Sequence, residues 1–289
     1  MTALAETRNA TRAFGTRVAV DAASMHIDAG ELVGLIGANG AGKTTLIRML
    51  LGLLRPTRGA VSLFGERPSR HTRERLGYVP QGLGLYPDLT VAENAAFTAG
   101  AFSLSPDQVQ MPGDLRSVRG ALAGRVGLGR QRQLAFACAL SHMPALLVLD
   151  EPTSGVSPLA RARLWDRIHE QVDRGVGVLV TTHYLQEAQQ CDRLVVMAAG
   201  RVVAIGTMEQ ITDGRRAVTV ETTAWRDAYD TLRSANMPVT LVGTQVRVAE
   251  GNAVEVRAAL HARRVHATVT DAPATLEETM LLIDRASPD

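Results

Sequence analysis

The sequence predicts an α/β protein built around a parallel β-sheet, followed by a smaller α+β unit. Residues 145–149 and 176–180 are all apolar, and continuous rather than alternating hydrophobicity is typical of central strands that are covered on both faces. A helical pattern over 159–172 lies between these two runs and predicts a crossover helix. Residues 32–36 form a third apolar run, which predicts a buried strand leading directly into a glycine-rich turn.

A helix is predicted to follow this turn. Leu46, Leu50, Leu53 and Leu54 recur at the spacing of one helix face, and Pro56 is expected to stop the helix. The local order is therefore strand, glycine-rich turn, helix.

The rest of the chain divides into a helical insertion and a second unit. Residues 91–139 are helical in pattern and rich in small side chains, which predicts an insertion in the sheet domain. After residue 213 the pattern follows the order β-α-β-β-α-β, which is that of a ferredoxin-like unit. Thr275 and Glu278 form a capping-box pattern that predicts a last helix. We therefore predict one domain over 1–213 and a second over 214–289. The six elements of the second domain are expected at 217–221, 225–232, 239–242, 245–248, 253–262 and 265–269.

The composition is that of a globular protein without a strong electrostatic field. The chain has 289 residues, of which 46% are hydrophobic and 21% charged, and its formal net charge is +2. So small a charge gives no reason to expect a nucleic acid partner. The two cysteines, Cys138 and Cys191, lack the spacing of metal ligands. They favour buried thiols in a reducing compartment, and so a cytoplasmic location.

We expect neither a signal peptide nor a membrane-spanning segment. The first residues include Glu6 and Arg8 and develop no apolar signal-peptide core. No uninterrupted apolar run approaches the roughly 20 residues that cross a bilayer. A function at a membrane would therefore need spanning helices from another chain.

The glycine-rich turn fits the pattern G-x-x-x-x-G-K-[ST]. Glycines let successive backbone N–H groups surround phosphate oxygens, and the following helix adds the positive end of its dipole. Lys43 is expected to bring its charge to the terminal phosphates as a catalytic residue, and the Thr44 hydroxyl to bind Mg²⁺. The sequence therefore predicts a site for ATP with Mg²⁺. The residues expected to line it are Gly37, Ala38, Asn39, Gly40, Ala41, Gly42, Lys43, Thr44 and Thr45.

Two carboxylates, Asp150 and Glu151, follow the apolar run that ends at residue 149. Ligand sites of open α/β sheets gather at the carboxyl ends of the strands. Asp150 is expected to hold Mg²⁺, and Glu151 to orient the attacking water as a general base. Alone, such a pair is more often a surface feature, but beside the glycine-rich turn it favours a catalytic site.

Three segments occur in an order that resembles the nucleotide-binding domain of ATP-binding cassette (ABC) proteins. They are Gly37–Thr45, Leu147–Pro152 and Thr181–His183, and the resemblance covers about residues 5–213. It implies an ATPase whose nucleotide lies between two paired domains. It also implies that His183 contacts the γ-phosphate.

The resemblance assigns two further residues. Gln81, in the segment Gly77–Gln81, matches the glutamine that touches Mg²⁺ and senses the membrane partner. Phe14 matches the aromatic residue that stacks on adenine.

The sequence departs from the family pattern where one domain would face its partner. The usual Leu-Ser-Gly-Gly-Gln signature aligns with Val126, Gly127, Leu128, Gly129 and Arg130, so its serine is Gly127 and its first glycine is Leu128. In the D-loop the usual aspartate is Ser157. Either this half of the site is weakened, or the variant is tolerated. Because the chain's own carboxylates and Lys43 are retained, we hypothesise that it works as a homodimer or, better, as a heterodimer with a second ABC subunit.

Two segments narrow the resemblance to the ATPases of type-2 ABC exporters, a group that includes antibiotic-resistance pumps. They are residues 273–278, near the end of the chain, and residues 85–94, after Gln81. The resemblance implies a polytopic membrane permease as partner, drug or antibiotic efflux as function, and a peripheral position on the inner face of the cell membrane. Two alternatives stay open: a non-transport ABC ATPase, and a regulatory nucleotide-binding module with weak hydrolysis.

Overall fold

The computed structural model describes residues 3–286, which form two compact units that divide between Val202 and Val203. The predicted boundary at residue 213 lies later in the chain. Helix α8 (Met208–Thr212) packs against α11 (Leu276–Ala286), and this contact places α8 in the second unit. Among the described residues, no helix is both long and apolar enough to cross a membrane.

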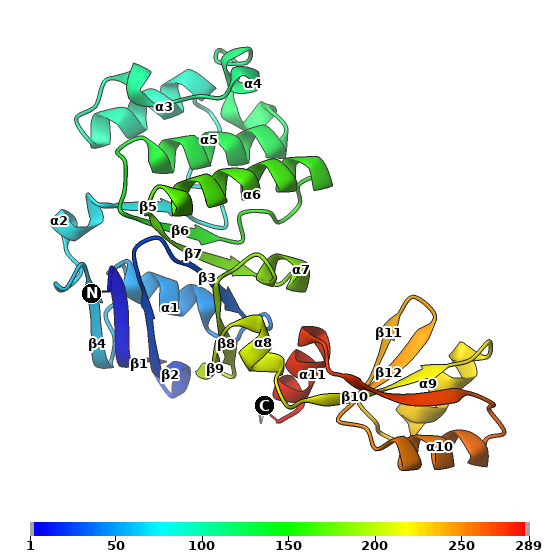
Figure 1. The fold of residues 1–289 in the computed structure, drawn as a ribbon. Helices are drawn as coiled ribbons and strands as arrows, with labels where there is room; N and C mark the ends of the chain where they lie inside the picture. Colours follow the sequence, from blue (N-terminus) through cyan, green and yellow to red (C-terminus); the bar gives the residue numbers. More distant parts are fainter. Residues whose placement is uncertain (1–2, 287–289) are drawn as a thin grey trace. The chain divides into compact units, whose positions relative to one another are not determined.

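A six-stranded sheet in the order β5-β6-β7-β3-β8-β9 organises the first unit, and its edge strand β9 continues past Val202 (Figure 1). The pairs from β5 to β8 are parallel, as the continuous apolar runs predict. The strands are β5 (Leu76–Val79), β6 (Leu146–Asp150), β7 (Gly177–Thr182), β3 (Leu32–Ile36), β8 (Arg193–Ala198) and β9 (Arg201–Gly206).

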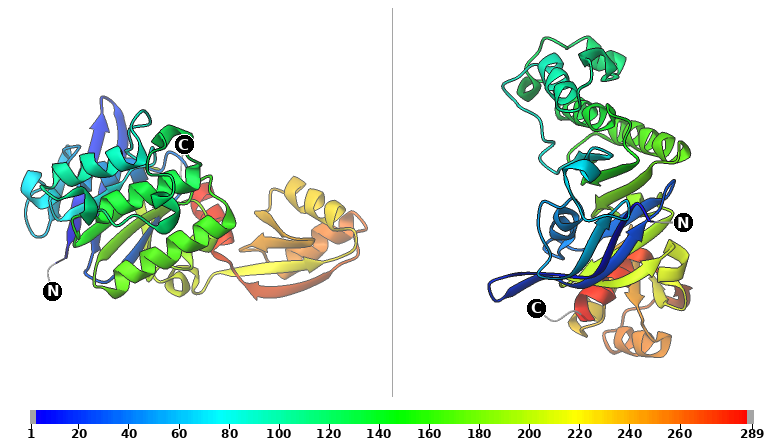
Figure 2. Two further views of the ribbon diagram at one scale, coloured as in Figure 1. Left: turned by 90° about the horizontal axis from the view of Figure 1, so that it is seen from above. Right: turned by 90° about the vertical axis from the view of Figure 1, so that its left-hand side faces the viewer.

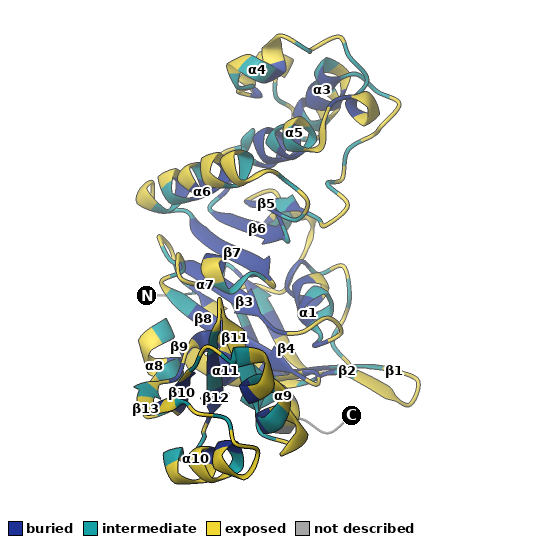
Figure 3. Ribbon diagram, turned by 90° about the vertical axis from the view of Figure 1, so that its right-hand side faces the viewer, coloured by how far each residue is buried: buried dark blue, intermediate teal, exposed yellow. Residues whose placement is uncertain are grey.

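The central strands β6, β7, β3 and β8 are buried on both faces and appear in the colour of buried residues in Figure 3, whereas the edge strand β9 is partly exposed. On one face, α5 (Leu128–Leu140) and α6 (Pro158–Asp173) pack through Phe136, Trp165 and Ile168. On the other face lies α1 (Lys43–Leu50), with Leu46 and Ile47 in the core. Crossover helices on both faces explain why neither face of these strands is polar.

A second, antiparallel sheet packs beyond α1, and its long hairpin is seen from two further sides in Figure 2. Its order is β2-β1-β4, and its strands are β2 (Arg17–Ile27), β1 (Ala5–Phe14) and β4 (Arg58–Leu63). Phe14 lies at the end of β1, just before the turn into β2.

The helical region expected over 91–139 is present and has a small core of its own. This core joins Val91, Leu115, Val126 and Leu134. The region contains α3 (Val91–Ala101), α4 (Gly113–Arg116), α5 and two short 3₁₀ turns (Pro106–Gln108 and Ala123–Arg125); the smaller helices α2 (Arg70–Arg73) and α7 (Leu185–Ala188) lie outside it.

Helix α1 is shorter than the leucine spacing predicts. It ends at Leu50, and Leu53 is 61% exposed instead of lying on the buried face. Gly52 adopts φ +68°, and the Leu53 N–H bonds back to the Arg48 carbonyl over 2.9 Å. A left-handed glycine of this kind closes a helix, so Gly52 ends it before Pro56 is reached.

The second unit is a four-stranded antiparallel sheet in the order β11-β12-β10-β13. Valines of these strands pack against α9 and α10 in one apolar cluster. The last strand begins later than the expected residue 265, because the Val265 N–H bonds to Leu260 in the turn that closes α10. The elements are β10 (Arg216–Glu221), α9 (Trp225–Ser234), β11 (Val239–Val242), β12 (Gln245–Ala249), α10 (Ala253–Ala262) and β13 (Thr268–Pro273).

Candidate active site

The glycine-rich turn joins β3 to α1 and allows only glycine at two positions. A Cβ on Gly37 would lie 2.2 Å from the carbonyl oxygen of Met197. A Cβ on Gly42 would lie 2.6 Å from the carbonyl oxygen of Ala19, and φ there is +100°. The turn therefore wraps closely against its neighbours with its backbone exposed to a ligand.

Lys43 is the first residue of α1, and its side chain is held at the turn. It is 7% exposed, and Nζ donates to the carbonyl oxygens of Gly37 (2.7 Å) and Ala38 (3.0 Å). Burial lowers the pKa of Lys43, against the opposing effect of the nearby carboxylates. The first turn of α1 has no side-chain cap, so its N–H groups and the helix dipole are available to an anion.

Asp150 lies at the carboxyl end of β6 and is 3% exposed. Its Oδ1 accepts a hydrogen bond from the Thr181 hydroxyl (2.7 Å), and its Oδ2 one from the Thr44 hydroxyl (3.5 Å). Burial raises the pKa of Asp150, and the hydrogen bond from Thr181 opposes that rise. A hydroxyl and a carboxylate oxygen side by side are hard ligands that suit Mg²⁺.

The side-chain oxygens of Thr44 and Asp150 fit a metal ion that takes only part of its coordination shell from the protein. Among the described residues, no group of three or more His, Cys, Asp or Glu side chains could hold a metal ion. Mg²⁺ usually binds through one or two protein oxygens and completes its shell with water and substrate phosphates. Thr44 and Asp150 meet that pattern, and Gln81 lies within reach of the neighbouring Glu151.

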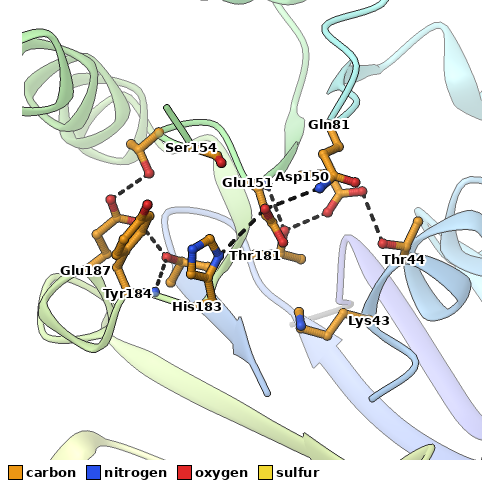
Figure 4. A network of polar contacts seen from close by, with 12 residues as sticks. Lys43, Thr44, Gln81, Asp150, Glu151, Ser154, Thr181, His183, Tyr184 and Glu187 are labelled. Carbon is orange, nitrogen blue, oxygen red and sulfur yellow. Dashed lines mark hydrogen bonds and ion pairs between the residues drawn. The ribbon is translucent and has the colours of Figure 1, made fainter. Parts of the chain in front are cut away.

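The carboxylate of Glu151 lies close to the side chains of two other predicted residues, Gln81 and His183, as Figure 4 shows. Its Oε2 lies 3.3 Å from Gln81 Nε2 and 3.6 Å from His183 Nδ1. Its backbone N–H donates to the Thr181 hydroxyl oxygen over 2.8 Å, and its φ is +50°. Lys43 faces the same carboxylates closely enough for them to affect its pKa. The loop after β6 therefore places the Glu151 carboxylate near Gln81, His183 and Lys43, which come from three other segments of the chain.

Three residues with structural roles at this site were not assigned from the sequence. Thr181 bridges Asp150 and Glu151, Arg132 donates to the carbonyl oxygens of residues 151 and 154, and Glu187 accepts hydroxyl hydrogen bonds from residues 153 and 182. Arg132 is 7% and Glu187 1% exposed. A charged residue in a helical pattern gives no sign of burial, so the sequence carried no signal for these two.

The remaining predicted residues lie apart from this network. Phe14 is 49% exposed, with the Arg12 guanidinium 4.6 Å from its ring centre. The segment Val126–Gly129 leads into α5, and Ser157 caps α6 by accepting the N–H of Ala160 (3.4 Å). Within residues 3–286, none of these has a hydrogen bond or ion pair to the glycine-rich turn or the two carboxylates.

The fold and the site define a P-loop nucleotide-binding protein. A glycine-rich turn lies between a parallel strand and a helix, its lysine is held at the turn, and a buried carboxylate stands beside the threonine that follows the lysine.

Comparison with known proteins identifies the family. The sequence profile of the ABC transporter family matches residues 20–154. The chain is 42% identical over 210 residues to the Nod factor export ATP-binding protein I of Burkholderia lata, covering 69% of each chain. It is 38% identical over 216 residues to the probable multidrug ABC transporter ATP-binding protein YbhF of Escherichia coli, but this match spans only 37% of that protein's length.

Solved structures agree with these relatives. An ATP-binding subunit of an ABC transporter superposes with a TM-score of 0.67 at 33% identity, covering 72% of this chain and 91% of that one. The chain belongs to the ABC transporter family, and within it the chain is similar to ATP-binding proteins and subunits.

Proposed function

We propose that this chain is the ATP-hydrolysing subunit that powers a membrane exporter of the type-2 ABC group. The observation that carries the proposal is the position of Glu151, whose carboxylate lies beside Gln81 and His183 at the carboxyl end of the sheet. This is the arrangement that a general base for water needs next to a nucleotide held by the P-loop.

Each residue has a role in this proposal. The N–H groups of Gly37–Thr45 and the ammonium of Lys43 hold the phosphates, and the ring of Phe14 stacks on adenine. Thr44 and Asp150, with Gln81, would hold Mg²⁺, and the ion would neutralise charge on the phosphate oxygens when bound. Glu151 orients water for in-line attack on the γ-phosphorus and accepts its proton, while the bond from the γ-phosphorus to the bridging oxygen breaks and ADP leaves. His183 donates to the γ-phosphate.

The proposal includes a second ABC subunit. Val126–Gly129 would face the partner's nucleotide, where Gly127 has no hydroxyl to offer and Leu128 is 39% exposed. Ser157, which caps the start of α6, would lie at the interface with the second subunit. Since the chain keeps its own Lys43 and carboxylates, its site would work best opposite a partner with a complete signature, that is, in a heterodimer.

Export is proposed from the relatives, two of which are named for multidrug transport and Nod factor export. Export requires a polytopic permease, and the chain would then lie on the cytoplasmic face of the cell membrane. We also propose that residues 214–289 are a ferredoxin-like module, supported by the order β-α-β-β-α-β and by its antiparallel sheet order.

The Glu151→Gln variant tests hydrolysis against a regulatory binding module. We expect ATP turnover to fall at least about 100-fold, as for loss of a general base, with ATP still bound. The control is Glu170→Gln, because Glu170 is exposed on α6. The same turnover in the parent chain and in Glu151→Gln would show that the chain binds nucleotide without hydrolysing it at this site.

A further inference from the structure

A buried arginine connects the start of α5 with the backbone of Glu151. Arg132 lies on α5 and is 7% exposed. Its Nη1 donates to the carbonyl oxygen of Glu151 (3.0 Å), and its Nη2 to the carbonyl oxygen of Ser154 (2.5 Å). A buried charge is tolerated only where it is hydrogen-bonded, so these two bonds fix the guanidinium against the loop after β6.

Glu151 depends on such support because of its backbone conformation. With φ at +50° it lies in the left-handed region, where a residue other than glycine stays only when its surroundings hold it. Thr181 accepts its N–H, and Arg132 donates to its carbonyl oxygen. The two backbone polar groups of Glu151 are therefore held from two different elements, β7 and α5. Within the loop the Ser154 N–H also donates to this carbonyl oxygen over 3.3 Å, so Arg132 adds a second, charged donor from outside the loop.

Helix α5 touches the same loop a second time. The Cδ2 atom of Leu128 lies 3.0 Å from the position that a Cβ on Gly155 would take. Leu128 is the first residue of α5 and belongs to the segment that the chain would offer to a partner. The start of α5 is therefore close to the loop 151–155 at two residues, Leu128 and Arg132.

We infer that Arg132 is a positioning residue for Glu151, and that it couples the segment 126–129 to the carboxylate of the chain's own site. The inference rests on the proposed function, because Arg132 acts on hydrolysis only through Glu151. It touches neither carboxylate group and needs no contact with nucleotide. Loss of Arg132 is therefore expected to lower the rate of ATP turnover and to leave ATP binding unchanged.

The full chain carrying Arg132→Met, Arg132→Lys or the control Arg163→Met tests this role. Arg163 is exposed on α6 and lines the same small cavity as Arg132. We expect Arg132→Met to lower kcat at least about 10-fold while KM for ATP stays within about two-fold. Arg132→Lys should fall between Met and the parent, because an ammonium cannot reproduce the two-nitrogen fork. Arg163→Met should match the parent.

A double-mutant cycle separates positioning from general structural damage. If Arg132 acts through Glu151, adding Arg132→Met to Glu151→Gln lowers the residual turnover no further. Independent, additive losses would overturn the inference, as would an equal fall in ATP affinity. If thermal melting shows that Arg132→Met does not fold, Arg132→Lys carries the same cycle.

Hydrogen exchange distinguishes failure of this inference from failure of the proposed function. The Ser154 and Val156 amides donate to the carbonyl oxygens of Glu151 (3.3 Å) and Thr153 (3.4 Å) within the loop. Their exchange should quicken in Arg132→Met, whereas the amides of β7 should not change. Unchanged loop exchange overturns the positioning role. Faster loop exchange in a chain that never hydrolyses ATP supports that role and overturns the proposed function.

Discussion

Thr181, on β7, donates its hydroxyl proton to Asp150, on the neighbouring strand β6, over 2.7 Å. The same hydroxyl oxygen accepts the N–H of Glu151 over 2.8 Å. One fully buried side chain thus orients the proposed Mg²⁺ ligand and holds the backbone of the proposed general base. The pairing of parallel strands places it there, because Asp150 and Thr181 are opposite residues in the register of β6 and β7.

Replacing Thr181 with valine keeps the shape and removes both hydrogen bonds. We expect the free energy of unfolding of the nucleotide-free chain to fall by about 2 kcal/mol, because a buried carboxylate and a buried N–H lose a partner. ATP turnover should fall at least about 10-fold, since both site residues are freed. Urea denaturation and steady-state hydrolysis measure the two effects.

The matched control is Thr181→Ser, which retains the hydroxyl and loses only a methyl group. Its turnover should stay close to that of the parent. A valine variant that hydrolyses ATP as fast as the serine variant would show that the bridge has no part in turnover.

Much of the site was predictable because its motifs are local. Lys43, Asp150 and Glu151 each follow a recognisable apolar strand, and the order of the motifs assigned Gln81 and His183 without any geometry. The structure then brings Glu151 together with Gln81 and His183. The sequence did not reveal the supports of these residues, because they act across space. Arg132 is 19 positions from Glu151 and lies in a different helix.

The main departures in the fold have equally local causes. The spacing of the leucines predicts a helix that extends past residue 50, but Gly52, with its left-handed backbone conformation, ends the helix earlier. Val265 belongs to the turn that closes α10, so the final strand starts later than the expected residue 265. Apolar periodicity reports which residues can be buried, whereas element ends depend on single backbone angles that a pattern does not contain.

Restoring the serine of the signature segment tests whether its absence limits hydrolysis. Gly127 has φ −59° and ψ 150°, which any residue adopts, and a Cβ there would meet no atom within 4 Å. Serine also fits the N-cap of α5, where it should add a few tenths of a kcal/mol to stability. We expect Gly127→Ser to raise the ATP turnover of the isolated chain several-fold, with a steeper dependence on protein concentration, because the proposed dimer would then offer a hydroxyl to the partner's γ-phosphate.

Gly127→Ala is the control, since it adds the Cβ without the hydroxyl. Turnover that rises equally in the alanine and serine variants would assign the effect to backbone stiffening. No rise in either variant would mean that the natural segment is a tolerated form, and the argument for a heterodimer would lose its support.

The ion pair between Arg247 and Glu278 fastens the last helix to the sheet of the second unit. Arg247 Nε lies 2.6 Å from Glu278 Oε1, and the two side chains are 11% and 0% exposed. Glu278 also accepts the Thr275 N–H (2.6 Å) in the capping box that the sequence predicts. Burial acts to raise the pKa of Glu278, but the hydrogen bonds from Arg247 and Thr275 outweigh it and the pKa is lowered.

The lowered pKa fixes how stability depends on pH. The folded chain holds Glu278 ionised more strongly than the unfolded chain does, so this stabilisation is complete above the unfolded pKa of about 4.3. It is lost as the pH falls through the lower, folded value. Glu278→Gln lacks the titration, and at pH 7 it should destabilise the second unit by about 3 kcal/mol, because it leaves Arg247 buried without its counter-ion. The difference between parent and variant should shrink toward pH 3.

The two tryptophans make this measurement specific, because Trp165 lies in the first unit and Trp225 in the second. In a Trp165→Phe background, the fluorescence of Trp225 follows urea unfolding of the second unit alone. The control is Glu250→Gln, since the pair of Glu250 with Arg215 is 56% and 34% exposed and solvent screens it. It should change stability little at either pH. A difference between parent and Glu278→Gln that is the same at pH 7 and pH 3 would show that the charge of Glu278 does not hold the helix in place.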